Sequence, residues 1–254
     1  YTLAAWNYIP SFNQKGIMMV AYAYEETGDP RYREAALAFA DRVTQQLKTR
    51  WFVAGTGVTP PTIGYDANIR PGYLGRDLVL MYRWTGRREY LEAAKRIFYG
   101  LKALRDSEDY GLLREGYGDP YSPWERLVTG TDLGVTEDNS DHFKPYILEY
   151  LLEGAQYVYE ETKDPVAKAT MVSLSDFMLQ ARQAGGFWNY AQRHAAEGNS
   201  THMTVEIANG LLNSYRLTGD RRYREAAFEA LHWVCKAYET YGAMLEGVVP
   251  PPDR

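Results

Sequence analysis

The sequence predicts an all-α protein built from four tandem antiparallel helical hairpins. Three observations lead to this prediction: a turn pattern that recurs along the chain, apolar residues at helical spacing beside each turn, and no segment with sustained β-strand alternation. The chain has 254 residues, of which 45% are hydrophobic, as is ordinary for a protein that buries a sizeable core. We expect one hairpin-repeat domain over residues 1–249 and a proline-rich tail at 250–254.

The recurring turn has the pattern T-G-x-x-x-Y-x-E-A-A. It begins at Thr27, Thr85 and Thr218, and a degenerate copy begins at Thr162. The glycine ends a helix in the left-handed conformation that other residues disfavour, and an aspartate or proline after it suits the start of the next helix. The tyrosine anchors the second helix, and the paired alanines let a neighbouring backbone approach closely. The pattern therefore predicts a tight helical hairpin at each of these positions.

Apolar residues at helical spacing set the expected extent of the helices. The first helices of the hairpins are expected near 12–26, 72–84, 142–160 and 203–217, and the second helices near 30–48, 88–104, 164–182 and 221–240. The turns within hairpins are short, whereas the connections between hairpins are long, at 49–71, 105–141 and 183–202. All long connections of an antiparallel stack lie at one end, so we expect the functional site there.

Charge and cysteine content narrow the possible partners. The net charge of −5 disfavours nucleic acid as a partner, and no apolar run is long enough for a membrane span.

The single cysteine, Cys235, excludes an intrachain disulfide, and we expect it to be buried in an apolar helical face. The sequence has no phosphate loop, no H-E-x-x-H and no C-x-x-C, so we predict neither a cofactor nor a metal site. The first residue is not Met and the last segment resembles a linker, so we expect further domains in a longer chain.

The long connections are rich in side chains typical of sugar-binding clefts. The chain contains 22 Tyr and 6 Trp but only 8 Phe, and Tyr and Trp combine an apolar body with a polar tip. We expect Trp124, Trp188 and Tyr190 either to stack on sugar rings or to pack on the helix ends. The expected partner is therefore a carbohydrate.

The pattern N-S-x-H occurs twice, each time at the start of a first helix. It runs from Asn139 to His142 and from Asn199 to His202. In a functional interpretation the histidines act as general acid or base while the asparagines hold a sugar carboxylate. In the alternative interpretation the motif is a duplicated helix cap. The two interpretations are compatible.

Acidic residues lie beside the first of these motifs. Asp138 and Asp141 are candidates for the paired carboxylates of glycoside hydrolysis, and the alternative is a solvated acidic loop. A calcium site is disfavoured because the EF-hand spacing and its glycine are absent.

A third candidate group leads into the second hairpin. Arg70 or Arg76 would clamp a carboxylate, and Tyr73 would donate a proton. Asp66 belongs to the same substrate-binding group. The alternative is an Arg–Asp network that fixes the loop.

Tandem hairpins with T-G-D-x-x-Y-x-x-A-A turns resemble the (α/α) toroid proteins, which include glycoside hydrolases, polysaccharide lyases, sugar epimerases and terpene cyclases. Residues 10–16, ahead of the turn at Thr27, look like a helix of uronyl epimerases and related enzymes. Gly185-Gly186-Phe187-Trp188, followed by Asn199 to His202, is similar to repeats of lyase and cyclase toroids.

The resemblance implies a carbohydrate-active enzyme that acts on an acidic polysaccharide or oligosaccharide by lyase, epimerase or hydrolase chemistry. Closed toroids usually have six or seven hairpins, so four indicate an open ring or one completed by further sequence. The alternative function is a non-catalytic helical module that binds glycan or protein.

Overall fold

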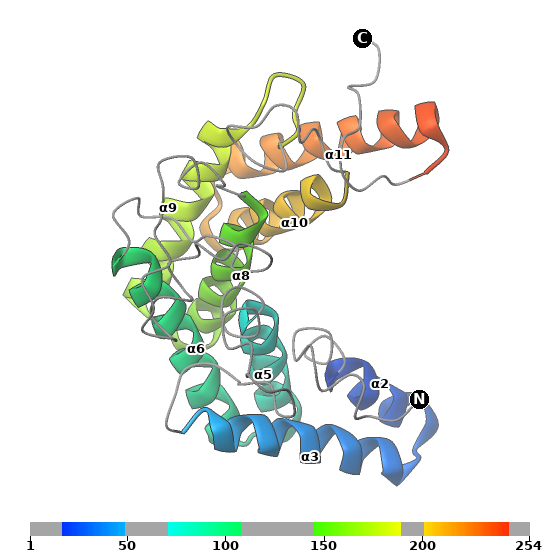
Figure 1. The fold of residues 1–254 in the computed structure, drawn as a ribbon, viewed down its shortest axis with the longest axis vertical. Coiled ribbons are helices and arrows are strands. Elements are labelled where there is room, and N and C mark those ends of the chain that lie inside the picture. Colours follow the sequence, from blue (N-terminus) through cyan, green and yellow to red (C-terminus); the bar gives the residue numbers. More distant parts are fainter. Residues whose placement is uncertain (1–16, 49–70, 108–144, 189–200, 244–254) are drawn as a thin grey trace, which may run out of the picture. The chain divides into compact units, whose positions relative to one another are not determined.

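The computed structural model describes residues 17–48, 71–107, 145–188 and 201–243, and these contain eight α-helices and no β-strand (Figure 1). The helices pair as hairpins: α2 (Ile17–Thr27) with α3 (Pro30–Gln46), α5 (Pro71–Thr85) with α6 (Arg88–Ser107), α8 (Pro145–Thr162) with α9 (Pro165–Ala181), and α10 (Thr201–Thr218) with α11 (Arg221–Tyr241). The predicted all-α hairpin architecture is confirmed. The observed bounds follow the expected ones closely, and the expected first start at residue 12 lies outside the described residues.

The chain divides into two compact units. The first comprises residues 1–111 and 116–133, and the second comprises residues 112–115 and 134–254. Within the first unit α2 packs beside α5 and α3 beside α6; within the second, α8 packs against α10 and α9 against α11. Each unit is therefore a stack in which first helices contact first helices and second helices contact second helices. The single domain over 1–249 stays a prediction, and the tail at 250–254 lies outside the described residues.

All four hairpin turns are closed by the same hydrogen bonds. The turn threonine donates its hydroxyl to the carbonyl oxygen four residues earlier at 2.6–2.7 Å, and the same hydroxyl accepts the N–H two residues later at 3.2–3.3 Å. The residue after the threonine donates its N–H to the carbonyl oxygen of a tyrosine four residues earlier. That residue has a positive φ in each turn, as Gly28, Gly86 and Gly219 and, in the degenerate copy, as Lys163 at φ 56°. The degenerate sequence copy therefore forms the same turn.

Aspartates at the third position of the turn begin the second helices. The side chains of Asp29, Asp164 and Asp220 accept the N–H two residues later at 2.8–3.0 Å, which satisfies a donor that the helix itself leaves unpaired. Arg31 lies beside Asp29, and its hydrogen bond lowers the pKa of that carboxyl group. These caps fix where the second helices start.

A second repeated contact joins neighbouring hairpins, and we call it the Asp–Tyr clamp. In the first unit the hydroxyl of the buried Tyr90 donates to Asp41 of α3 at 2.7 Å, and Arg87 donates to the same carboxylate at 3.2 Å. Burial raises the pKa of Asp41, but the hydrogen bonds from Arg87 and Tyr90 outweigh it and lower that pKa. Burial and the nearby carboxylate raise the pKa of Tyr90 far above its usual value, so the hydroxyl stays protonated and donates.

The second unit repeats the clamp with Tyr223 and Asp176 of α9, whose atoms lie 3.0 Å apart. Burial, followed by the hydrogen bond to Asp176, raises the pKa of Tyr223 to about 12. The two aspartates each follow their turn threonine by 14 residues, and the two tyrosines each follow theirs by five. The clamp is therefore a property of the repeat.

The repeat also shows where the clamp is missing. Tyr32 stands at the tyrosine position of the first hairpin, and it is 40% exposed. The second hairpin has Tyr99 at the aspartate position, and the third has Ala167 at the tyrosine position. The second hairpin therefore lacks the clamp aspartate, and the third lacks the clamp tyrosine.

The expectation that Cys235 is buried is wrong. It is exposed on α11, because the buried face of that helix is formed by its neighbours in the helical repeat: Tyr223, Ala226, Ala227, Ala230, Trp233, Val234 and Ala237. The residue directly after Val234 falls beyond the edge of this face.

Replacing Tyr90 with Phe removes the clamp hydroxyl and keeps the ring. We expect the free energy of unfolding to fall by about 1–2 kcal/mol, because a part-buried carboxylate loses a hydrogen bond. Tyr32→Phe is the matched control at the equivalent exposed position, with an expected change below about 0.5 kcal/mol. Urea unfolding of both variants measures the difference, and equal losses would contradict the contribution of the clamp.

Candidate functional site

The N-terminal halves of three first helices carry acidic side chains that are buried or partly buried. Asp77 of α5 is 1% exposed, and Glu149 and Glu153 of α8 are 2% and 4% exposed. The side chain of Glu206 on α10 is 18% exposed. Buried carboxylates are rare in proteins, and they concentrate where chemistry requires them. These halves of the helices are the ones next to the long connections, toward the end of the hairpins where the sequence predicts the site.

In the first unit the buried carboxylate is paired with its neighbour along α5. The Nε of Arg76 donates to Oδ1 of Asp77 at 3.0 Å. Burial raises the pKa of Asp77 above its usual value, and the charge of Arg76 opposes the shift without cancelling it. A carboxyl group with a raised pKa is suited to donate a proton. The contact supports the Arg–Asp network for Arg76, and Tyr73, one turn earlier on α5, has a side chain outside the described part.

In the second unit, polar side chains lie along the contact between α8 and α10. Gly210 makes the close approach possible, since a Cβ there would lie 3.1 Å from Cδ2 of Leu152 and 3.6 Å from Oε1 of Glu149. One turn further along each helix, Nε2 of Gln156 donates to the carbonyl oxygen of Gly210 at 2.6 Å and to Oγ of Ser214 at 2.8 Å. The contact between these helices is therefore polar over several turns.

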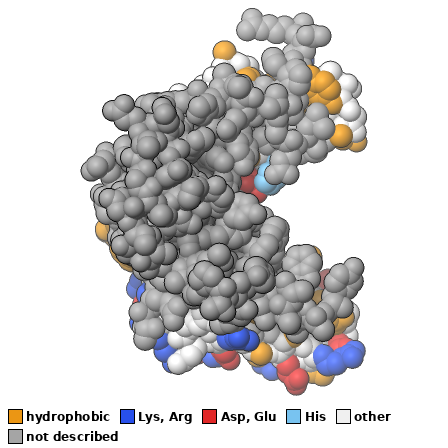
Figure 2. All heavy atoms as spheres, in the orientation of Figure 1, with side chains coloured by type: hydrophobic (Ala, Val, Ile, Leu, Met, Phe, Trp, Pro, Cys, Tyr) orange, Lys and Arg blue, Asp and Glu red, His pale blue; other side chains and the backbone are white. Residues whose placement is uncertain are grey.

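A histidine lies near the N-terminal end of α10, beside this contact. Nε2 of His202 lies 3.1 Å from Oε1 of Glu206, with 51% of the histidine side chain exposed. His202, Glu206 and Gly210 are spaced four apart, so they follow one face of α10 from the surface toward Glu149. Figure 2 shows a histidine side chain directly beside an acidic one at the surface. A carboxylate that holds an imidazole in this way orients it for proton transfer.

Trp188 lies in the core of the second unit. It is completely buried, and its indole N–H donates to the carbonyl oxygen of Met178 at 2.9 Å. The preceding Gly186 has φ 92°, and a Cβ there would lie 3.0 Å from the backbone of Glu229. The glycine pair thus lets the chain turn tightly against α11 and direct the indole inward. Of the two interpretations of Trp188, this placement supports packing rather than stacking on a sugar.

The remaining predicted site residues lie outside the described residues, and their roles stay predictions: Asp66, Arg70, Trp124, Asp138, Asn139, Asp141, His142, Tyr190 and Asn199. The predicted site residues did not include Glu149, Glu153 or Glu206, because they were drawn from the long connections and the helix starts. A signal was nevertheless present, since Glu149 and Glu153 are four residues apart in a helix whose other buried residues are mostly apolar.

The residues that the structure describes include no group of three or more His, Cys, Asp and Glu side chains placed to hold a metal ion. None of the described helices is both long and apolar enough to cross a membrane.

The replacement Asp77→Asn tests the buried carboxylate through the pH dependence of stability. The pKa of Asp77 in the folded protein lies above its usual 3.8, so the folded state binds the proton more tightly than the unfolded state. As pH falls through the raised pKa toward 3.8, the wild type should gain stability relative to the variant. Urea unfolding over a pH series measures this gain.

Asp41→Asn is the control variant, for which the pH dependence of stability should have the opposite sign. The pKa of Asp41 is lowered in the folded protein, so the wild type should lose stability relative to this variant as pH falls from 3.8 through the folded-state pKa. If stability relative to the variant changed with pH in the same direction for both residues, the explanation would be contradicted. Burial would then not dominate the pKa of Asp77, or hydrogen bonding would not dominate that of Asp41.

No protein-family model and no curated protein matches the chain. Solved structures with the same fold include a glycosyl hydrolase family 88 protein from Bacteroides vulgatus, with a TM-score of 0.64 and 13% identity over 95% of this chain and 65% of that one. An unsaturated glucuronyl hydrolase from Streptococcus agalactiae matches with a TM-score of 0.61 and 18% identity, over 85% of this chain and 56% of that one. The chain thus spans less than two thirds of the length of either. The predicted resemblance to (α/α) toroid carbohydrate-active enzymes is confirmed as a similarity of fold.

Proposed function

We propose that this chain forms part of a glycoside hydrolase that acts on oligosaccharides containing uronic acid, with its chemistry in the N-terminal halves of the first helices. The observation that carries the proposal is the enclosure of carboxylates between two helices of the second unit: Glu149 and Glu153 of α8 are buried, and Glu206 of α10 is partly buried. The two structures of similar fold support it, because they are named as a family 88 glycosyl hydrolase and an unsaturated glucuronyl hydrolase.

Glycoside hydrolysis uses two carboxyl groups, one that protonates the leaving oxygen and one that activates water or attacks the sugar. In the second unit, Glu206 is within reach of solvent and is held beside His202, so it is the candidate base. Glu149 is buried against α10 at Gly210, and it is the candidate proton donor. The first unit offers Asp77 as a separate candidate donor, because burial raises its pKa.

A uronate substrate brings a negative charge to an acidic site, and this repulsion has to be offset. The helix N-termini provide the opposite polarity, since the first turns of α8 and α10 leave backbone N–H groups without helical partners. In the same unit, Glu149 follows the first residue of α8 by four positions, and Glu206 follows that of α10 by five. A sugar carboxylate bound at the helix ends, with its glycosidic bond near the acidic side chains, satisfies both requirements.

A second candidate function follows from the pair formed by His202 and Glu206. Lyases and epimerases remove the proton beside a uronate carboxylate, and an exposed histidine held by a carboxylate is a suitable base. The non-catalytic module remains the alternative from a different class. The experiment is therefore an assay that separates these reactions.

The protein is incubated with oligosaccharides that end in glucuronate, in an unsaturated glucuronyl residue or in glucose, while reducing ends and ultraviolet absorbance are followed together. Hydrolysis produces reducing ends without new absorbance from an unsaturated product, and this is the expected result for the substrates ending in glucuronate or unsaturated glucuronyl. New absorbance would indicate β-elimination and transfer the assignment to a lyase. The absence of both signals would contradict the hydrolase.

Glu206→Gln and His202→Ala should each reduce turnover by about 100-fold, because general acid–base groups typically contribute 10²- to 10⁴-fold. His232→Ala is the matched control, since His232 is also an exposed histidine on a helix and lies on α11. Steady-state rates on the substrate that is turned over measure the effect. Equal rates for all three variants would remove these residues from the site.

Gly210→Ala tests the position of Glu149. The added Cβ meets Leu152 at 3.1 Å and Glu149 at 3.5 Å, so these side chains must shift. We expect turnover to fall by about tenfold, while stability changes by less than about 1 kcal/mol because alanine favours the helix. Gly154→Ala on α8 is the control, since no atom lies within 4 Å of its Cβ, and it should be stabilising with unchanged turnover.

A further inference from the structure

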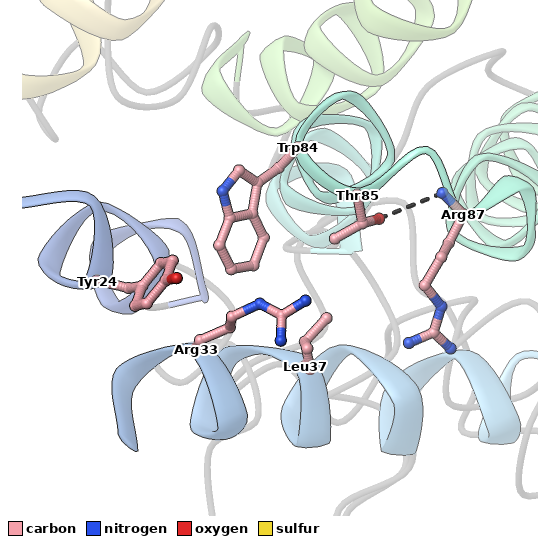
Figure 3. Close-up of a pocket in the computed structure, with 6 residues that line it drawn as sticks. All are labelled: Tyr24, Arg33, Leu37, Trp84, Thr85 and Arg87. Carbon is pink, nitrogen blue, oxygen red and sulfur yellow. Dashed lines mark hydrogen bonds between the residues drawn. The ribbon is translucent and has the colours of Figure 1, made fainter. Parts of the chain in front are cut away.

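A cavity of about 340 Å³ lies within the first unit, at the short-turn ends of the first two hairpins (Figure 3). Its lining residues come from three helices and one turn: Tyr24 of α2, Arg33 and Leu37 of α3, Trp84 and Thr85 of α5, and Arg87 before α6. A volume of this size is typical of a small-molecule site. These residues belong to the hairpin end opposite to the buried carboxylates, so the proposed catalytic residues do not account for the cavity.

Two aromatic rings form one side of the cavity. The rings of Tyr24 and Trp84 have centroids 6.1 Å apart and planes inclined by 68°, which is an edge-to-face arrangement. In this arrangement the two rings do not cover each other face to face, and Figure 3 shows the indole directed from α5 toward α3. Such a ring face is a platform for the apolar C–H face of a sugar. Leu37 adds an apolar contact beside the rings.

The two arginines of the cavity differ in their partners. Arg87 is held by Asp41 at 3.2 Å and by Glu89 at 2.7 Å, so its charge is already balanced. Arg33 is exposed and has neither an ion pair nor a hydrogen bond within the described part of the chain. Figure 3 shows its guanidinium lying between the aromatic rings and Leu37. A planar guanidinium in this place has donors for both oxygens of a carboxylate.

We propose that this cavity is a binding site for a uronic acid unit, in which Arg33 pairs with the sugar carboxylate and Trp84 supports the sugar ring. The combination is specific because a neutral sugar satisfies only the rings and a simple carboxylate satisfies only the arginine. The site does not depend on catalysis, since its lining residues do not include Asp77, the buried carboxylate of the same unit.

Isothermal titration calorimetry with methyl glucuronide tests the proposal, with methyl glucoside and acetate as ligand controls. Binding of the glucuronide should be saturable and at least about tenfold tighter than that of either control, which corresponds to one charge-assisted interaction. Arg33→Gln should reduce glucuronide affinity to the level of the glucoside and leave the glucoside unchanged. Trp84→Leu should weaken both sugars.

Arg42→Gln is the matched protein control, since Arg42 is an exposed arginine on α3 that does not line the cavity. It should leave affinity within about twofold. Equal affinity of the wild type for glucuronide and glucoside, or unchanged affinity in Arg33→Gln, would overturn the proposal. Glu206→Gln should retain the Arg33-dependent binding even where turnover is lost, so failure of the hydrolase assignment and failure of this site are distinguishable.

Discussion

Every hairpin depends on one backbone constraint, the residue held at positive φ between two helices. The chain can reverse within two residues only if that residue adopts the left-handed conformation. The threonine before it, and in three of the four turns the aspartate after it, supply hydrogen bonds that the two helix ends lack. Lys163 shows the strength of the constraint, because the flanking Thr162 and Asp164 keep the turn although the central residue is not glycine. The direction of each second helix, and hence the stacking within each unit, follows from this turn.

The architecture could be predicted because its determinants are local. A turn of ten sequence positions and a helical apolar period are both visible in a single sequence, so the helices and their pairing were expected correctly. The burial of individual side chains depends on packing between hairpins. This is why Cys235 was expected in the core and is exposed. For the same reason Trp188, considered for a sugar-binding surface, is completely buried.

The candidate site shows the same difference between features that the local sequence predicts and features that depend on packing. His202 was selected from sequence because a histidine motif recurs at helix starts, and the structure places it beside Glu206. Glu149 and Glu153 were overlooked because a glutamate in a helix is ordinarily a solvent-facing residue. Only the contact between α8 and α10, made close by Gly210, shows that they are enclosed. Asp77 directly follows Arg76 in the sequence, but only its burial in the structure shows that its pKa is raised.

The Asp–Tyr clamp gives the hairpin a direction. Each of the clamped pairs joins an aspartate of the earlier hairpin to a tyrosine of the later one. A hairpin that carries both residues therefore has two different contact surfaces, one for the preceding hairpin and one for the following hairpin. If the gene segment for such a hairpin is duplicated, the copy carries both the aspartate and the tyrosine. The array of hairpins can then lengthen by repeating the same interface. A hairpin without one of the two residues, such as the second with Tyr99 or the third with Ala167, lacks that half of the contact. A repeat protein of this kind can therefore change its length separately from its chemistry.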